Sequence, residues 1–179
     1  MMIEKKIQYC PSCGSKEIEI DFEDKKLTCL SCGFVYYFGV ASASGCIISD
    51  GERVLVTIRG IEPGKGKYDL PGGFSKPDET FEDATRREVF EELGLRLDEL
   101  EYIGSWPNTY LYRGIEYPVL DVFFLAEFPD AEIKIDHDEI SDIKFVSKST
   151  FDPDQFAFES HKNALKKYFS RSNIAFEKD

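Results

Sequence analysis

The segment from Gly73 to Leu95 constrains this chain more than any other part of its sequence. It follows a Gly-Gly turn, has helical periodicity, and carries Glu88, Glu91 and Glu92 at i, i+3 and i+4. At about 100° per residue, these three side chains fall within one arc of about 100° on a helix. Their mutual repulsion would destabilise an isolated helix, so this face must meet either water or a cation.

The neighbours of the three carboxylates favour the cation. Oxygen ligands select a hard divalent ion such as Mg²⁺ or Mn²⁺, which also accepts substrate phosphates as ligands. The alternative is an acidic helix face in water. That alternative does not explain the preceding Gly-Gly turn, Arg87 beside the cluster, or Val89 and Leu93 on the adjoining apolar side. We therefore predict a helix with Thr80 as N-cap that ends at Gly94 and binds Mg²⁺ or Mn²⁺.

The same segment resembles the Nudix box, G-x5-E-x7-R-E-U-x-E-E-x-G-U, in which U is an aliphatic residue. Every fixed position matches over 23 residues: Gly73, Glu79, Arg87, Glu88, Val89, Glu91, Glu92, Gly94 and Leu95. A complete match of this length is highly specific. The resemblance implies an α/β fold, the Nudix α/β/α sandwich with a mixed sheet. It also implies a pyrophosphohydrolase that acts on phosphorus-containing anhydrides.

The resemblance assigns metal-binding roles within the box. Glu91 and Glu92 are implied to be primary Mg²⁺ ligands, together with the Gly73 carbonyl. Glu88 is implied to be either a further ligand or the base that orients water. With these ligands a divalent ion would neutralise the diphosphate and activate water, so neither a nucleophilic side chain nor a catalytic histidine is required.

Three more residues have implied supporting roles. Arg87 would hold a carboxylate in place by ion pairing, and Glu79 would support the site electrostatically. Nudix proteins often add an acidic residue from a later loop, and Glu139, in the acidic run 136–139, is the best candidate. The alternative for this run is a solvated acidic loop.

Four cysteines near the N-terminus predict a second, different metal site. They form two Cys-x2-Cys pairs separated by 15 residues: Cys10, Cys13, Cys29 and Cys32. Four thiolates form a closed, structural zinc site, and the alternative is four buried free cysteines. The pattern resembles a zinc ribbon, as in NADH pyrophosphatase-like Nudix proteins, so we predict a ribbon at 1–39 and a Nudix hydrolase domain at 40–179.

Charge and hydropathy limit the partners of this chain. The formal net charge is −12, of which residues 1–39 contribute −1, so neither part attracts a phosphate backbone or an anionic membrane. We expect the ribbon to stabilise the protein or to contact a second subunit in a homodimer rather than to bind nucleic acid. No stretch has the roughly 20 apolar residues of a membrane helix, and the paired cysteines favour a reducing compartment. These features predict a cytoplasmic location.

The remaining pattern predicts strands and a second helix. Asp50-Gly51 predicts a hairpin turn, and Pro71-Gly72-Gly73 is expected to break a strand. Cys46, in an apolar strand, is expected to be buried. The predicted strands are 40–49, 54–59, 68–70, 102–112, 117–128 and 143–146, and the second helix is 155–169, with Phe156, Leu165 and Phe169 on its inner side.

Residues outside the box predict the substrate class. Arg59 is a candidate for binding phosphate, or equally for a surface ion pair, and Trp106, Tyr110 and Tyr112 could stack on a base or belong to the core. His161, in the second predicted helix, is interpreted as a surface or cap residue. We expect a dinucleotide-type substrate such as NADH, ADP-ribose or FAD. The alternatives are a nucleotide sensor without turnover and a zinc-ribbon adaptor.

Overall fold

The computed structural model describes residues 6–171, which fall into two compact units. The first contains the residues up to Ala41 together with Thr109–Pro118. The second contains Ser42–Asn108 and the residues from Val119 onward. Within residues 6–171, no helix has both the length and the apolar character needed to cross a membrane.

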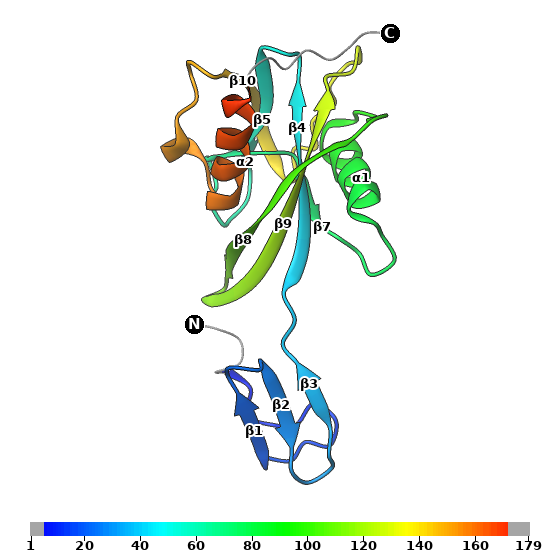
Figure 1. Ribbon diagram of the computed structural model, residues 1–179, viewed down its shortest axis with the longest axis vertical. Helices are drawn as coiled ribbons and strands as arrows, with labels where there is room; N and C mark the ends of the chain where they lie inside the picture. The colour runs from blue at the N-terminus through cyan, green and yellow to red at the C-terminus, as the bar shows by residue number, and fades with distance from the viewer. Residues whose placement is uncertain (1–5, 172–179) are drawn as a thin grey trace. The chain divides into compact units, whose positions relative to one another are not determined.

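The first unit contains a small antiparallel sheet that the sequence analysis did not predict. Its strands are β1 (Ile18–Asp21), β2 (Lys26–Cys29) and β3 (Val35–Tyr37), in the order β1-β2-β3 (Figure 1). Leu27, in the central strand, is fully buried, whereas all of β3 is exposed. So small a core supplies little hydrophobic stabilisation, so the sheet depends on another source of folding energy.

The second unit contains most of a larger mixed sheet in the order β10-β5-β4-β9-β8, whose β8–β9 turn belongs to the first unit. β6 pairs with β5, and β7 pairs with β4. In Figure 1, β4 and β9 run in the same direction, whereas β5 and β10 pair antiparallel. The strands are β4 (Ala41–Ser49), β5 (Arg53–Arg59), β6 (Tyr68–Asp69), β7 (Gly72–Phe74), β8 (Glu101–Tyr112), β9 (Ile115–Glu127) and β10 (Ile140–Ser147).

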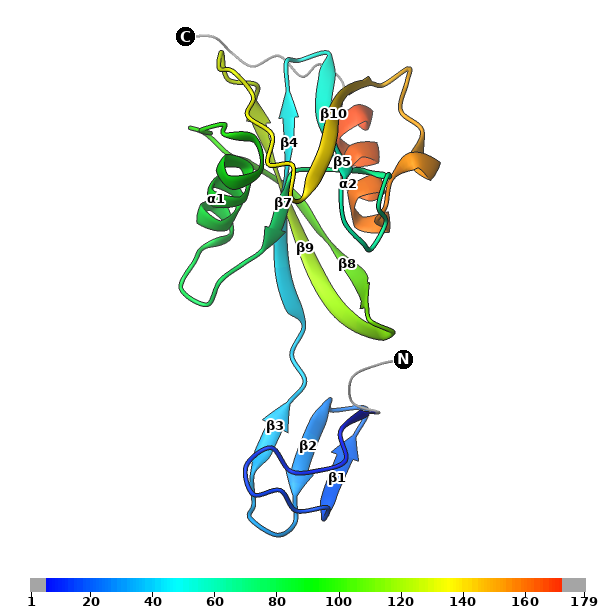
Figure 2. The same cartoon turned by 180° about the vertical axis from the view of Figure 1, so that it is seen from behind.

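The two long helices cover opposite faces of this sheet. Helix α1 (Phe81–Leu93) and helix α2 (Glu159–Ser170) lie on either side of β4 in both views (Figures 1 and 2). Strand alternation divides the apolar side chains between the two faces. Cys46 and Ile48 pack with α1, whereas Ile47 between them packs with α2. This arrangement confirms the predicted α/β/α sandwich and the burial of Cys46.

Helix α1 has the caps that its sequence predicts. The Thr80 side chain accepts a hydrogen bond from the Asp83 backbone N–H at 3.1 Å. Gly94 adopts the left-handed conformation and its N–H donates to the Phe90 carbonyl. Both predicted ends of the helix are therefore confirmed, and the acidic side chains have fixed positions along its axis.

Two predictions about local structure need correction. Pro71 does end β6, but the two glycines after it form the new strand β7, in which Gly73 pairs with Ser44. The second helix begins at Glu159, not at Gln155. Pro153–Gln155 form the separate 3₁₀ turn η2, because the Asp152 side chain caps it and the chain then returns to an extended conformation. Phe156 is buried as expected, but outside the helix.

Candidate functional site

The four paired cysteines come together within the first unit. Their sulfur atoms all lie within 4.8 Å of one another, with Cys10 Sγ 3.8 Å from Cys32 Sγ and Cys13 Sγ 3.7 Å from Cys29 Sγ. A tetrahedral zinc site with Zn–S distances of about 2.3 Å requires sulfur separations of about 3.8 Å. The donors thus fit a four-coordinate zinc ion, with no ligand position left for a substrate.

The two cysteine pairs have the same local geometry. Gly14 N–H donates to the Cys10 carbonyl at 3.0 Å, and Gly33 N–H donates to the Cys29 carbonyl at 3.0 Å. Both glycines are in the left-handed region, with φ of 73° at Gly14 and 74° at Gly33. Each pair therefore turns tightly enough to direct two sulfurs toward one point. The backbone conformation of each pair is therefore set by the five residues from its first cysteine to the following glycine.

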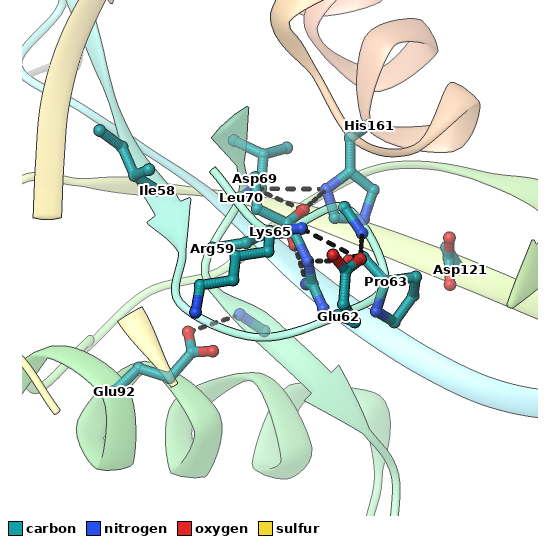
Figure 3. A network of polar contacts seen from close by, with 12 residues as sticks. Ile58, Arg59, Glu62, Pro63, Lys65, Asp69, Leu70, Glu92, Asp121 and His161 are labelled. Carbon is teal, nitrogen blue, oxygen red and sulfur yellow. Dashed lines mark hydrogen bonds and ion pairs between the residues drawn. The ribbon is translucent and has the colours of Figure 1, made fainter. Parts of the chain in front are cut away.

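The α1 carboxylate most enclosed by the protein is Glu92. Its Oε2 accepts a hydrogen bond from the Gly72 backbone N–H at 3.0 Å (Figure 3). Burial raises the pKa of Glu92 well above its ordinary value, although the Gly72 N–H opposes this shift. The negative charges of Asp69, Glu88 and Glu139 raise it further. Glu92 therefore lies in a site where negative charge is in excess.

Gly73 and Glu88 lie in close contact across β7 and α1. A Cβ atom at Gly73 would lie 2.6 Å from Cδ of Glu88, which is closer than real Cβ contacts. A side chain at this position would force the Glu88 carboxylate to move. Burial raises the pKa of Glu88, whereas Arg87 lowers it and the charges of Glu91 and Glu139 raise it. The box glycine and the box glutamate are therefore neighbours, and their implied roles toward a metal ion stay predictions.

Arg87 links three of the acidic residues of the box. Its guanidinium binds both carboxylate oxygens of Glu79, at 2.5 and 2.8 Å. It also donates to Glu88 at 2.6 Å and to Glu91 at 2.9 Å. The hydrogen bonds from Arg87 lower the pKa of Glu79 to about 2. Arg87 thus fixes the directions of these carboxylates while the outer part of Glu91 stays exposed.

The acidic loop before β10 reaches the same site. The last carbonyls of α1 have no helical partners, and two of them accept backbone N–H groups from this loop: Lys134 to Leu93 at 2.8 Å and Asp136 to Glu92 at 2.9 Å. The exposed Glu139 follows, and its charge acts on both Glu88 and Glu92. The loop therefore brings a further carboxylate toward the α1 cluster.

This donor set fits a hard divalent ion. Carboxylates from α1 and the nearby loop, with the Gly73 backbone, offer oxygen atoms only, and burial followed by the charges of neighbouring carboxylates raises the pKa of Glu92. Within the described residues, only the four cysteines place all their ligand atoms within 4.8 Å of one another. The carboxylates are more widely spaced, which suits a site shared with waters and substrate oxygens.

Arg59 and His161 form a buried network that the sequence analysis missed. Arg59 Nη1 binds Asp69 Oδ2 at 2.5 Å, and His161 Nδ1 binds the other oxygen of Asp69 (Figure 3). His161 is neither a surface nor a cap residue, and the ion pair of Arg59 is largely buried. The signal was present in the sequence: Asp69 is a charged residue in a short strand directly before Leu70-Pro71.

The three aromatic candidates fall in different surroundings. Trp106 packs against Phe123, with ring centroids 5.8 Å apart, beside the α2 core. Tyr110 and Tyr112 lie in the hairpin that belongs to the first unit, and Tyr112 is 47% exposed beneath Arg113. A role of these side chains in substrate stacking stays a prediction.

The fold and the site together define the family. The NUDIX domain profile matches residues 40–169, so the chain belongs to the Nudix family. A crystal structure of a NUDIX hydrolase from Nitrosomonas europaea has a TM-score of 0.71 and 25% identity, and the match covers 91% of this chain and 90% of that one. The match includes the α/β/α architecture described above.

The curated relatives have names that state a substrate, whereas the solved structure is named only as a NUDIX hydrolase. A protein from Haemophilus influenzae (strain PittEE) named NAD-capped RNA hydrolase NudC is 30% identical over 142 residues, 78% of this chain and 51% of that protein. A protein of the same name from Pseudomonas putida is 28% identical over 148 residues, 82% of this chain and 50% of that protein. The chain thus spans about half the length of the curated relatives it matches.

Proposed function

We propose that this chain is a Mg²⁺- or Mn²⁺-dependent Nudix hydrolase that cleaves the pyrophosphate bond of a nucleoside diphosphate linked to another moiety. The observation that carries this proposal is the environment of Glu92. This carboxylate is partly buried, accepts one backbone N–H, and has its pKa raised by burial and by three acidic neighbours. A divalent ion supplies positive charge, neutralises the diphosphate and makes water a better nucleophile.

Each side chain then has a definite task. Glu91 and Glu92, with the Gly73 carbonyl, supply metal ligands, and Glu88 either joins them or accepts the proton of the attacking water. Arg87 and Glu79 hold the carboxylates in direction through the bonds described above. Glu139 contributes negative charge from the loop. The site is open on the side of Glu91, whose side chain is 52% exposed, so substrate oxygens can reach it.

The substrate proposal is a dinucleotide such as NADH, ADP-ribose or FAD. The relatives named NAD-capped RNA hydrolases support a diphosphate-linked nucleotide, because an NAD cap contains that linkage. A free dinucleotide suits the net charge of −12 better than a long polyanion does. Arg59 is already paired with Asp69, so we assign phosphate binding chiefly to the metal site.

The four-cysteine unit has a separate, structural task in this proposal. We infer a zinc ribbon at 1–39 and a hydrolase domain at 40–179. Four thiolates would fill the coordination sphere of the zinc ion, so no position is left for water or substrate. Stabilisation of the chain, or contact with a second copy, fits a ribbon with a local net charge of −1. Free cysteines and thiolate zinc both suit the cytoplasm, where we place the protein.

A substrate screen tests the proposal. NADH, ADP-ribose, FAD, an NAD-capped RNA and deoxynucleoside triphosphates are incubated with the zinc-loaded protein and Mg²⁺, and released monophosphates are quantified. We expect a dinucleotide to have the highest kcat/KM and no turnover in EDTA. Tenfold higher kcat/KM for a triphosphate would contradict the dinucleotide proposal. Binding without turnover of any compound would instead identify a nucleotide sensor.

A further inference from the structure

A buried charged network joins helix α2 to the strand that leads into the acidic site. Asp69, in β6, is 6% exposed, and each of its carboxylate oxygens has its own side-chain partner, the Arg59 guanidinium or the His161 imidazole. Burial raises the pKa of Asp69, but the charges and hydrogen bonds of His161 and Arg59 lower it below its ordinary value. A buried carboxylate in this state needs both partners to remain in place.

The histidine is held in one orientation. Its ring lies 4.9 Å from the Phe123 ring and 5.3 Å from the Phe158 ring, measured between centroids. Nδ1 faces Asp69, as Figure 3 shows. Because aromatic packing and the carboxylate both restrict the imidazole, His161 fixes the position of Asp69 relative to α2.

Asp69 in turn begins the segment that meets the α1 carboxylates. The Leu70 N–H donates to Asp69 Oδ1 at 3.0 Å, and the Pro71 carbonyl accepts from Cys46 N–H at 2.9 Å. The next residue, Gly72, donates its N–H to Glu92. The backbone between the buried ion pair and Glu92 is therefore short and held by a hydrogen bond at each of these points.

We propose that Asp69 and His161 are positioning residues for the divalent-ion site, which they order through the Leu70–Gly73 backbone. This inference rests on the proposed function in one respect, that Glu88 and Glu92 are metal ligands. His161 does not touch the reacting groups. It contacts Asp69 and accepts a hydrogen bond from the Leu70 N–H at 3.2 Å, and Asp69 accepts from the same N–H. The segment that begins there provides the hydrogen bond to Glu92 and the space for Glu88.

The test compares two contacts of the same helix. His161→Leu removes the contact with Asp69, whereas Tyr168→Phe removes the buried 2.6 Å hydrogen bond from α2 to Ser49, away from β6. Mn²⁺ affinity of the zinc-loaded full chain is measured without nucleotide by electron paramagnetic resonance, alongside melting temperature. We expect His161→Leu to weaken Mn²⁺ binding about tenfold, as for other residues that orient metal ligands, and Tyr168→Phe to leave it unchanged.

Conservative variants separate positioning from general stability. His161→Asn keeps an N–H donor near the Nδ1 position and should restore most of the Mn²⁺ affinity. Asp69→Asn should weaken binding as His161→Leu does, and the double variant should lose little more, because both act through one connection. In turnover assays with Mg²⁺, His161→Leu should lower kcat with little change in KM.

Each result decides the inference. Unchanged Mn²⁺ affinity in His161→Leu, equal weakening in Tyr168→Phe, or no Mn²⁺ binding by the wild-type protein would overturn it. If the wild-type protein binds Mn²⁺ but hydrolyses nothing, the proposed function fails while the affinity comparison still decides the positioning role. If wild-type turnover is normal and His161→Leu matches it in both assays, the positioning role alone fails.

Discussion

The cysteine site and the α1 carboxylate site differ in how many separate elements of the chain shape them. Each cysteine pair is shaped by its own five-residue turn, with a backbone hydrogen bond to the glycine that follows it. The carboxylates lie on one helix but need β7 for Gly73, Arg87 for their direction and a later loop for Glu139. One site is closed and local, and the other is open and depends on the whole sheet.

This difference separates what each proposed metal would contribute. Zinc in a closed four-thiolate site would contribute folding free energy to a small unit that has little apolar core. An open site of crowded carboxylates costs stability until an ion and a substrate arrive. Removing one ligand should therefore have opposite effects on stability in the two places.

The largest expected effect is on turnover. Glu92→Gln should lower kcat by about 10³ or more, because the ion supplies most of the charge stabilisation. Steady-state kinetics with the best substrate from the screen measures this. Turnover like that of the wild type would contradict the metal assignment.

Glu92→Gln also tests whether the crowded carboxylates lower the stability of the folded protein. The pKa of Glu92 is raised in the folded protein, so its ionisation destabilises the fold: this cost is absent below the ordinary pKa of 4.5 and grows as the pH rises from there through the raised pKa. Glu92→Gln should thus raise the melting temperature without divalent ions at pH 7. Added Mg²⁺ should stabilise the wild-type protein more than the variant.

The cysteine site should respond in the opposite direction. Cys13→Ser should abolish stoichiometric zinc binding and lower the melting temperature or disperse an oligomer, because the zinc contributes directly to folding. Zinc analysis, calorimetry and light scattering measure these quantities. Cys46→Ala is the matched control: it removes a buried thiol from the main sheet and should leave one zinc per chain. Wild-type protein without zinc would refute the ribbon.

A smaller effect is expected for the loop carboxylate. Glu139→Gln should lower kcat/KM about tenfold, less than the box glutamates, because Glu139 is exposed and acts on Glu88 and Glu92 through its charge. Asp138→Asn, one residue away and also exposed, should have little effect. Equal effects of both changes would show that only the general charge of the loop matters.

The smallest expected effect is a pH-dependent loss of stability in Glu79→Gln. Glu79 has a pKa of about 2 in the folded protein against an ordinary value of 4.5, so its bond to Arg87 stabilises the fold above pH 4.5 and is lost as the pH falls toward 2. The melting-temperature difference between variant and wild type should be largest at pH 7 and vanish near pH 2. A difference independent of pH would contradict this origin.

The predictable features are those encoded within a few residues. Helix α1, its caps and the tight turn of each cysteine pair follow from spacing, because turns and i+3 or i+4 contacts are local. The repeated Cys-x2-Cys pattern predicted that the two pairs meet. The strands of the ribbon and the start of α2 could not be predicted in this way. Short strands with little apolar alternation carry a weak signal, and Phe156 is buried by the sheet rather than by a helical pattern.

The least predictable feature was the pairing of Asp69 with His161. Neither residue has a neighbour in the sequence that indicates the other, and only the packing of α2 against the sheet brings them together. Arg59 was ambiguous for the same reason: its role depended on a partner ten residues away, in a strand reached through a loop.

The hydrogen bonds from the loop at residues 134–136 to the end of α1 also have a kinetic consequence. Helix α1 can form from local contacts early in folding, so its three glutamates are aligned early. In the sequence, strands β8 and β9 lie between α1 and this loop. The loop can bond to the last carbonyls of α1 only when this long intervening segment has folded back, and such non-local contacts form slowly. Glu139 should therefore be the last carboxylate to arrive, so a nascent chain would acquire its helix well before its complete ion site.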